Sequence, residues 1–335
     1  MNRSGKLASM PGKRAFEEKI AALDALRQAP EESRLASLRK ALGHRNNFIV
    51  GKAADLVREF RVEQLIPDVL AAFDRFLENP EKTDPQCWAK NAISRTLAAL
   101  EYQEPEVFLR GMRHIQMEPV WGGRSDTAGT LRATCALALV QCRSVRETDL
   151  LARLVDLLAD KDQTVRAEIV RAIEQVGSPS AALLLRLRAV LGNDEPQVLG
   201  ACYGGVLRIE GVSALAWVAQ FLKSADDAAG EAALAIAGTH SMEGFQVLRE
   251  SFEKADDPWF LSVLLSAIAL TRQDAGLKFL LDLVRTESLH AEGAIEAILQ
   301  SMPSKENIQR LEKLVAGNAR LTQALIAHSQ SDRSR

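Results

Sequence analysis

The stretch DKDQTVRAEIVRAIEQV, Asp160 to Val176, decides the fold of this chain. Its acidic turn ends at Asp162, and apolar residues then recur every three or four positions, which places them on one side of a helix. These residues are Val165, Ile169, Ala172, Ile173 and Val176. The preceding segment has the same period in Leu150, Leu151, Leu154, Val155, Leu157 and Leu158. The two segments therefore predict a pair of helices joined by a short turn, and because such a pair cannot bury both apolar faces alone, we expect copies on either side.

Equivalent apolar positions recur along most of the chain. With Val165 as the anchor of a second helix, the equivalent residues are Ala89, Leu131, Val198, Ala228, Phe260 and Ala291, at steps of 30 to 42 residues. The first helices keep a similar step, at Leu158, Leu191, Leu222, Phe252, Val284 and Val315. Acidic turn residues such as Asp126, Asp226 and Asp257 precede the second helices, where they can accept hydrogen bonds from free N–H groups. This pattern predicts an array of helical hairpins.

Composition agrees with an all-α class. Aromatic residues make up only 5% of the 335 residues, and the chain is rich in the helix formers Ala, Leu, Glu and Arg. We predict one repeat domain over residues 15–328, a flexible basic tail at 1–14 and a disordered C-terminal tail at 329–335. The last helix is expected from Ile308 to about His328, and no strands are expected.

The second helices resemble those of the HEAT-repeat family. Asp162, Val165, Arg166, Ile169, Ala172 and Ile173 are similar to the family's D-x-x-V-R-x-x-A-x-x-A-L pattern, and Leu131, Arg132, Cys135, Ala138 and Leu139 match it in the preceding repeat. Bacterial HEAT-like proteins, including phycobilisome lyases, share this pattern. The resemblance implies a right-handed α-solenoid of about eight hairpins that acts as an interaction scaffold.

Charge is uneven along the chain although its net value is only −2, with a pI near 6.3. Residues 1–61 hold thirteen Lys or Arg against seven Asp or Glu, a local charge of +6, whereas residues 210–313 hold nine against sixteen, or −7. The slightly acidic total argues against a generally basic nucleic-acid binder. A basic N-terminal group could still contact nucleic acid, but a solvated helix end is the preferred interpretation; it comprises Arg39, Lys40, His44, Arg45 and Lys52, with Asn46, Asn47 and Phe48.

Neither a signal sequence nor a membrane span is predicted. The N-terminus lacks an apolar centre, and no run of residues is judged to approach the roughly twenty apolar residues of a membrane helix. We therefore expect a soluble, cytoplasmic protein.

Catalytic and metal-binding motifs are not found in the sequence. The five histidines are scattered, and the four cysteines have no zinc-binding spacing, so no catalytic residue, cofactor or metal is assigned. HEAT-like DNA glycosylases use a carboxylate and aromatic residues, and Trp88, Trp121 and Asp126 could mimic part of that arrangement. For lyase chemistry, only Cys87 offers a thiol outside the expected buried positions. We expect no enzyme.

Lys90, Arg132 and Arg166 occupy equivalent positions in successive second helices. They could form a basic ladder on the concave face that attracts an acidic partner or a phosphate backbone. They could instead pair with acidic turn residues of a neighbouring repeat, as Asp126 and Asp162 would permit. The second interpretation is preferred because such pairs are common.

The clearest break in the repeat is the 115–126 loop, which contains Trp121, Gly122, Gly123 and Arg124. A tryptophan on an adaptable segment is typical of an interface anchor. Trp121 could equally fold back to cover the gap between repeats two and three, and the sequence leaves these alternatives open.

A second irregularity is a group of glycines, Gly200, Gly204 and Gly205, inside a second helix. Close packing against the next repeat, with a local bend, is favoured over close approach of a ligand.

Together these features favour a non-enzymatic scaffold. It would bind a protein partner of unknown identity through the concave surface and the 115–126 loop, using Trp121, Arg124, Lys90, Arg132 and Arg166. A nucleic-acid-binding protein, including a DNA-glycosylase-like one, or a phycobilisome-lyase-like protein is the alternative.

Overall fold

The computed structural model describes residues 11–331, and these are mostly helical, which confirms the all-α class. The chain divides into two compact units, one ending at Ala172 and the other beginning at Ile173. The division falls inside helix α10 (Gln163–Val176). The single domain over residues 15–328 stays a prediction.

The first unit contains nine helices before α10 and one β-hairpin among the described residues. The helices are α1 (Pro11–Ala25), α2 (Glu31–Leu42), α3 (Asn47–Phe60), α4 (Ile66–Leu77), α5 (Pro80–Thr83), α6 (Trp88–Ala99), α7 (Glu106–Met112), α8 (Gly129–Val140) and α9 (Glu147–Leu157). Strands β1 (Met117–Val120) and β2 (Gly123–Asp126) lie between α7 and α8.

The second unit is helical throughout its described residues. Its helices after α10 are α11 (Pro179–Leu191), α12 (Pro196–Glu210), α13 (Leu215–Ala219), α14 (Asp227–Ala237), α15 (Met242–Lys254), α16 (Pro258–Leu270), α17 (Asp274–Arg285), α18 (Ala291–Ser301), α19 (Lys305–Val315) and α20 (Ala319–Ser331).

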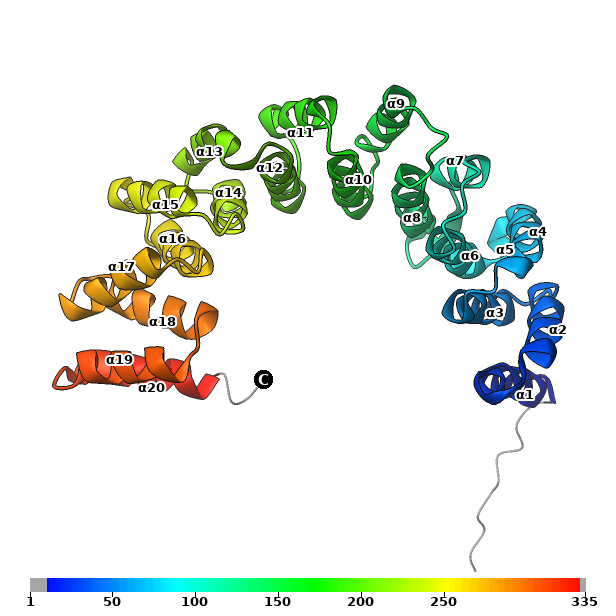
Figure 1. Cartoon of the computed structure of the whole chain (residues 1–335), viewed down its shortest axis with the longest axis horizontal. Helices are drawn as coiled ribbons and strands as arrows, with labels where there is room; N and C mark the ends of the chain where they lie inside the picture. Colours follow the sequence, from blue (N-terminus) through cyan, green and yellow to red (C-terminus); the bar gives the residue numbers. More distant parts are fainter. Residues whose placement is uncertain (1–10, 332–335) are drawn as a thin grey trace, which may run out of the picture. The chain divides into compact units, whose positions relative to one another are not determined.

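Helices in each unit pack as hairpins in series, and alternate helices fall in two layers (Figure 1). In the first unit the second helices α3, α6 and α8 contact one another in order, and α2 contacts α4 in the other layer. In the second unit the order of contacts is α12, α14, α16, α18 and α20, with α13, α15, α17 and α19 in the other layer. Six of the seven predicted apolar anchors are buried: Ala89, Leu131, Val165, Val198, Phe260 and Ala291. The seventh, Ala228, is half-buried, and its neighbour Ala229 is buried instead.

Three predicted helix boundaries are corrected. The last predicted helix is two helices, because the chain turns at Gly317, whose φ of +94° is a conformation that glycine adopts without strain. The first helix begins at Pro11, within the predicted tail, and α20 continues to Ser331. The remainder of both predicted tails lies outside the described residues.

Gly200 of α12 packs closely against the next repeat, as expected from the sequence, whereas Gly205 packs against α11 of its own repeat and Gly204 faces Arg208 of its own helix. A Cβ on Gly200 would lie 2.9 Å from the Cβ of Glu231 in α14, and a Cβ on Gly205 would lie 2.6 Å from a methyl carbon of Leu185 in α11. Both positions therefore admit only glycine without movement of a neighbour.

One stretch, Pro196–Lys223, corrects the expectation that no run approaches the length of a membrane span. It has 28 residues, and its most apolar window has a mean hydropathy of 1.3, enough to cross a membrane by length and composition alone. It is interrupted at Gly211, and 61% of its most apolar window is buried among other helices. Such burial is what a core helix of a soluble protein shows.

Candidate functional site

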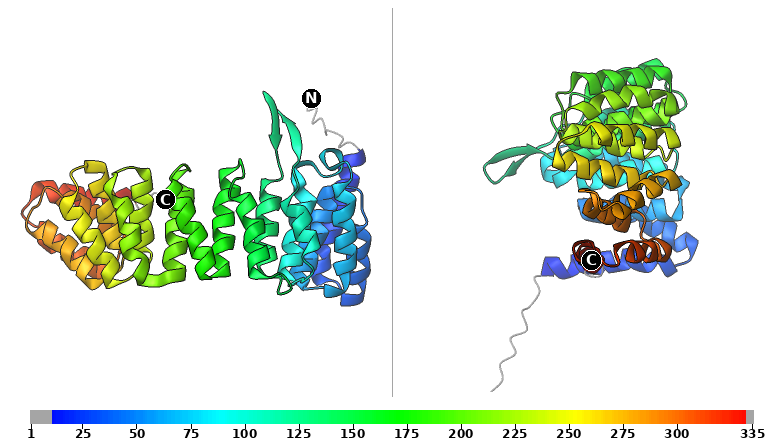
Figure 2. Two further views of the ribbon diagram at one scale, coloured as in Figure 1. Left: turned by 90° about the horizontal axis from the view of Figure 1, so that it is seen from above. Right: turned by 90° about the vertical axis from the view of Figure 1, so that its left-hand side faces the viewer.

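The 115–126 loop forms a β-hairpin, contrary to the expectation that the chain contains no strands. Its strands pair antiparallel, with Val120 opposite Gly123 and Met117 opposite Asp126, so Trp121 and Gly122 make the turn. Gly122 has a φ of +90°, as the second central residue of a type II turn requires. The hairpin projects away from the helices that flank it (Figure 2).

Apolar side chains on the hairpin face solvent. Trp121 is fully exposed at the turn, with a relative exposure of 104%, and Val120 beside it is 48% exposed. Met117 and the preceding Ile115 are also exposed. These four residues are called the apolar hairpin surface. Trp121 therefore does not fold back over the helices, which excludes the second of the two alternatives.

The base of the hairpin is held by buried polar contacts. Glu118 is 8% exposed, and its Oε1 accepts hydrogen bonds from the Gln86 backbone N–H at 2.6 Å and from the Thr127 hydroxyl at 3.0 Å. The Gln116 side-chain amide donates to Glu118 and to the Asp84 carbonyl oxygen. Burial opposes ionisation of Glu118, but the hydrogen bonds outweigh it, and the pKa of this carboxyl lies below its ordinary value.

The same contacts hold a strained segment ahead of α6. Gln86 and Cys87 both have left-handed backbone conformations, with φ of +58° and +53°. Non-glycine residues adopt this region only at a cost, so surrounding contacts must maintain it. The hydrogen bond from the Gln86 N–H to Glu118 is one such contact, and it couples the hairpin to the start of α6.

Asp126 at the end of β2 connects the hairpin to the next helices. It accepts hydrogen bonds from the backbone N–H groups of Gln116 and Ala128 and pairs with Arg132 at 2.6 Å. Arg132 also pairs with Asp160 at 2.7 Å in the turn before α10. Burial raises the pKa of Asp126, but these donors outweigh that effect and hold it below its ordinary value. To act as a general base, the Asp126 carboxylate would therefore have to lose its contacts with three partners.

The basic ladder is buried, which corrects the assignment of Lys90, Arg132 and Arg166 as partner-binding residues. Lys90 is 0% exposed, Arg132 5% and Arg166 9%. Each side chain binds an acidic residue six positions earlier in the sequence, through either the carboxylate or the backbone carbonyl oxygen of that residue. Lys90 pairs with Asp84 at 3.1 Å, Arg132 pairs with Asp126, and Arg166 donates to the Asp160 carbonyl oxygen at 2.6 Å. These side chains close the turns before their own helices, whereas the preferred interpretation had each of them pair with an acidic turn residue of a neighbouring repeat. The Arg132–Asp160 pair is of that predicted kind.

Arg124 is the exception among the predicted basic contacts. Its side chain is 53% exposed on β2, where it pairs with Glu81 at 2.8 Å and donates to the Met117 carbonyl oxygen. It therefore remains on the surface beside the apolar hairpin surface.

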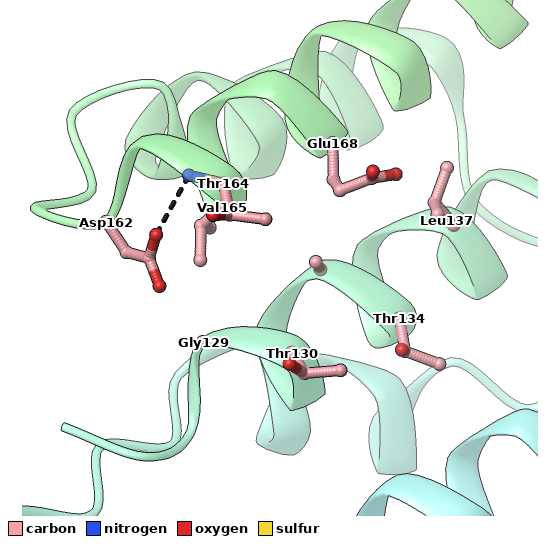
Figure 3. A pocket seen from close by; sticks show the side chains of 9 residues that line it. Gly129, Thr130, Thr134, Leu137, Asp162, Thr164, Val165 and Glu168 are labelled. Atoms are coloured by element: carbon pink, nitrogen blue, oxygen red, sulfur yellow. Dashed lines mark hydrogen bonds between the residues drawn. The ribbon is translucent and has the colours of Figure 1, made fainter. Parts of the chain in front are cut away.

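A hollow of about 270 Å³ lies between α8 and the first turns of α10 (Figure 3). Its lining is formed by Gly129, Thr130, Ala133, Thr134, Leu137, Asp162, Thr164, Val165 and Glu168. Asp162 accepts a hydrogen bond from the Thr164 N–H at 2.8 Å. A Cβ on Gly129 would lie 2.7 Å from an Asp162 carboxylate oxygen, so glycine permits this close approach. The hollow opens three residues after the hairpin ends and presents hydroxyls and carboxylates but no basic group.

Trp88 and Cys87, which were considered for enzymatic roles, are packed against other residues of the fold. Trp88 is half-exposed, packs against Phe48 with ring centroids 4.8 Å apart, and lies over Gly51. Cys87 is buried, which corrects its placement outside the buried positions, and burial raises the pKa of its thiol to about 12. Among residues 11–331, no three His, Cys, Asp or Glu side chains are grouped closely enough to hold a metal ion.

Most of the basic N-terminal group is engaged in local contacts. Lys52 pairs with Asp24 at 2.8 Å and Arg39 with Asp68 at 3.3 Å. Asn46 caps α3, and buried Asn47 donates to Asp84. Lys40 and Arg45 of this group are exposed.

No protein-family model matches the chain, and no curated protein matches it significantly.

Proposed function

We propose that this protein is a HEAT-like, right-handed α-solenoid that acts in the cytoplasm as a non-enzymatic scaffold. It binds a protein partner through the β1–β2 hairpin. The observation that carries the proposal is the full exposure of Trp121 at the tip of a hairpin whose base is held by buried hydrogen bonds.

Exposed tryptophan of this kind is well suited to binding. An indole ring buries roughly 200 Å² when it enters a pocket, which corresponds to about 5 kcal/mol of gross hydrophobic transfer. Part of that free energy is offset by the lost freedom of the two partners and of the ordered side chains. Because the hairpin base is already fixed by Glu118 and Gln116, less ordering remains to be done on binding.

Polar features beside the hairpin supply the rim of the proposed interface. Arg124 lies on β2, and the hollow between α8 and α10 begins at Gly129. A partner would place an apolar pocket over Trp121 and hydrogen-bond donors toward Asp162 and Glu168. Lys90, Arg132 and Arg166 no longer belong to the contact surface because they are buried.

Affinity capture from extracts of the source cells tests the proposal. Wild type, Trp121→Ala and Leu289→Ala are compared, because Leu289 is a 91% exposed apolar residue in a loop of the second unit and serves as a matched control. We expect a defined partner to be captured by wild type and Leu289→Ala but not by Trp121→Ala. An identical set of captured proteins for all three would remove Trp121 from the proposal.

A further inference from the structure

Three successive second helices of the second unit carry acidic residues but no basic ones. None of the residues of α14, α16 and α18 is lysine, arginine or histidine, and these helices lie side by side in one layer (Figure 1). The first helices α15, α17 and α19, in the other layer, contain seven lysines and arginines. The single base of α12, Arg208, pairs with Glu174. The second-helix layer is therefore acidic around α14 and α16.

Apolar side chains are exposed on the same layer. Leu234 on α14 is 43% exposed, and Trp259 on α16 is 46% exposed. The Trp259 ring lies on the backbone of α14, because a Cβ on Gly230 would lie 3.3 Å from the Cη2 atom of the ring. The indole therefore bridges the two helices while much of its surface remains in solvent. Asp227 and Glu231 share the exposed side of α14 with Leu234, and these three residues with Trp259 are called the α14–α16 face.

The two carboxylates of this face have no counter-charge. Asp227 and Glu231 lie one turn apart, and among residues 11–331 no side chain forms a hydrogen bond or an ion pair with either of them. Glu231 is half-buried over Gly200 of α12. Burial raises the pKa of the Glu231 carboxyl, and the like charge of Asp227 raises it further. A cationic group placed beside both carboxylates would offset this repulsion.

Acidic residues further along the layer already have partners. Glu292 of α18 pairs with Arg320 of α20 at 3.2 Å. Glu296 accepts a hydrogen bond at 2.9 Å from Gln300 in the next turn of α18. The uncompensated negative charge of these helices therefore lies on α14, next to the exposed apolar side chains.

From this arrangement we infer that the α14–α16 face is a second binding surface, which takes a basic segment of a partner protein. An arginine or lysine of the segment pairs with Asp227 and Glu231, and a neighbouring apolar side chain packs on Leu234 and Trp259. An indole ring also attracts a cation that lies over its face. The surface lies in the second unit and shares no residue with the β1–β2 hairpin, so it goes beyond the proposed function.

Charge selects this occupant over other kinds of partner. Unpaired carboxylates repel the phosphates of a nucleic acid and of an anionic membrane. A metal ion would meet only two carboxylates and would leave Leu234 and Trp259 in water. A segment that combines basic and apolar side chains complements both parts of the face.

Fluorescence anisotropy of a labelled peptide, titrated with the full-length chain, tests the inference. The probe has about twelve residues, in which arginine and leucine alternate. We expect saturable binding with a dissociation constant in the micromolar range, weakened several-fold when the salt concentration rises from about 50 to about 500 mM. A matched peptide with glutamate in place of arginine should not bind. No saturation at about 300 μM protein, or equal binding of the glutamate peptide, would overturn the inference.

A pair of charge-removing variants locates the binding site. Asp227→Asn combined with Glu231→Gln removes both charges and nearly preserves the size of the side chains, so the dissociation constant should rise at least about tenfold in a folded protein. Glu243→Gln combined with Glu312→Gln is the matched control, because it removes the same charge from exposed positions on α15 and α19. The control should stay within about twofold of wild type. Equal weakening in both double variants would show a general charge effect and would refute the assigned site.

Trp259→Ala tests the apolar part of the surface. It should raise the dissociation constant of the arginine–leucine peptide at least about fivefold, but should change little for a peptide with glycine in place of leucine. Equal effects on the two peptides would contradict the proposed packing on Trp259. Trp121→Ala should bind the probe as wild type does, so this inference and the proposed function can fail separately. A comparable loss of affinity in Trp121→Ala would place the peptide on the hairpin and overturn the inference.

Discussion

Replacement of Lys90 by alanine should strongly destabilise the protein. The Lys90 side chain and the Asp84 carboxylate are both 0% exposed, with Nζ and Oδ2 3.1 Å apart, and Nζ also donates to the Phe76 carbonyl oxygen at 3.2 Å. Asp84 further accepts the backbone N–H groups of Ala89 and Lys90 at the start of α6. Removal of the ammonium leaves a buried carboxylate without a counter-charge.

Breaking one side of a buried ion pair costs roughly 3–5 kcal/mol. For a cooperative unit of roughly 150–250 residues this corresponds to a fall in melting temperature of roughly 6–20 °C. Urea and thermal unfolding, followed by circular dichroism, measure the effect. Lys161→Ala is the matched control, because Lys161 is exposed and its side chain should contribute less than about 0.5 kcal/mol.

A double variant separates the ion pair from other consequences of losing the lysine. Asp84→Asn combined with Lys90→Ala removes the isolated charge, so it should be less destabilised than the sum of the two single variants predicts. If the free energy of unfolding of Lys90→Ala lies within about 0.5 kcal/mol of the wild-type value, Lys90 and Asp84 do not form the buried ion pair described above. Lys90 would then again be a candidate partner-binding residue.

Two further predictions concern ionisation and thiol reactivity. Acid should weaken the hairpin base. The pKa values of Asp126 and Glu118 in the folded chain lie below their ordinary values of 3.8 and 4.5. The two carboxylates therefore stabilise the folded state fully when the pH is above these ordinary values, and this stabilisation is lost as the pH falls through the lower pKa values of the folded state. Melting temperatures from about pH 6 to about pH 2.5 should therefore fall less steeply for Asp126→Asn than for wild type, and parallel curves would contradict this. Burial raises the pKa of the Cys87 and Cys202 thiols to about 12, so at about pH 8 a thiol reagent should label no cysteine in the folded protein and all four in urea. Rapid labelling of native Cys87 would refute this placement.

Sequence periodicity predicted the second helices well because it reports directly on burial. Val165 and Ile169 were chosen from their spacing alone, and both are buried. The same reasoning joined α19 to α20, because apolar residues continue in helical spacing past Gly317. A left-handed turn at one glycine is a local backbone choice that periodicity does not detect.

The hairpin had a weaker signal in the sequence. The two glycines after Trp121, Gly122 and Gly123, suit a tight turn, and this was the only cue to strands. The segment has no copy in the other repeats, so comparison between repeats could locate the irregularity but not its conformation. The functional importance of the 115–126 segment stays a prediction, whereas its strands, which the structure shows, were not predicted.

Burial of the basic ladder could not be read from the pattern. Lys90, Arg132 and Arg166 were correctly assigned to equivalent positions of successive repeats. The spacing in the sequence is the same, however, for a basic side chain on the surface and for one that is buried against the turn before its own helix. For Lys90 the difference depends on how residues 80–87 bring Asp84 against the start of α6. That geometry is set by tertiary contacts with Glu118 and Gln116, which lie about thirty residues further along the chain.

The most direct test of the central claim is the affinity of the purified, captured partner for wild type and for Trp121→Ala, measured by calorimetry alongside the melting temperature of each. An anchor that fills a pocket contributes roughly 2 kcal/mol or more, so the dissociation constant should rise at least about thirtyfold in Trp121→Ala. The melting temperature should stay the same because Trp121 makes no buried contact. An affinity within about twofold of wild type, at unchanged stability, would contradict the account.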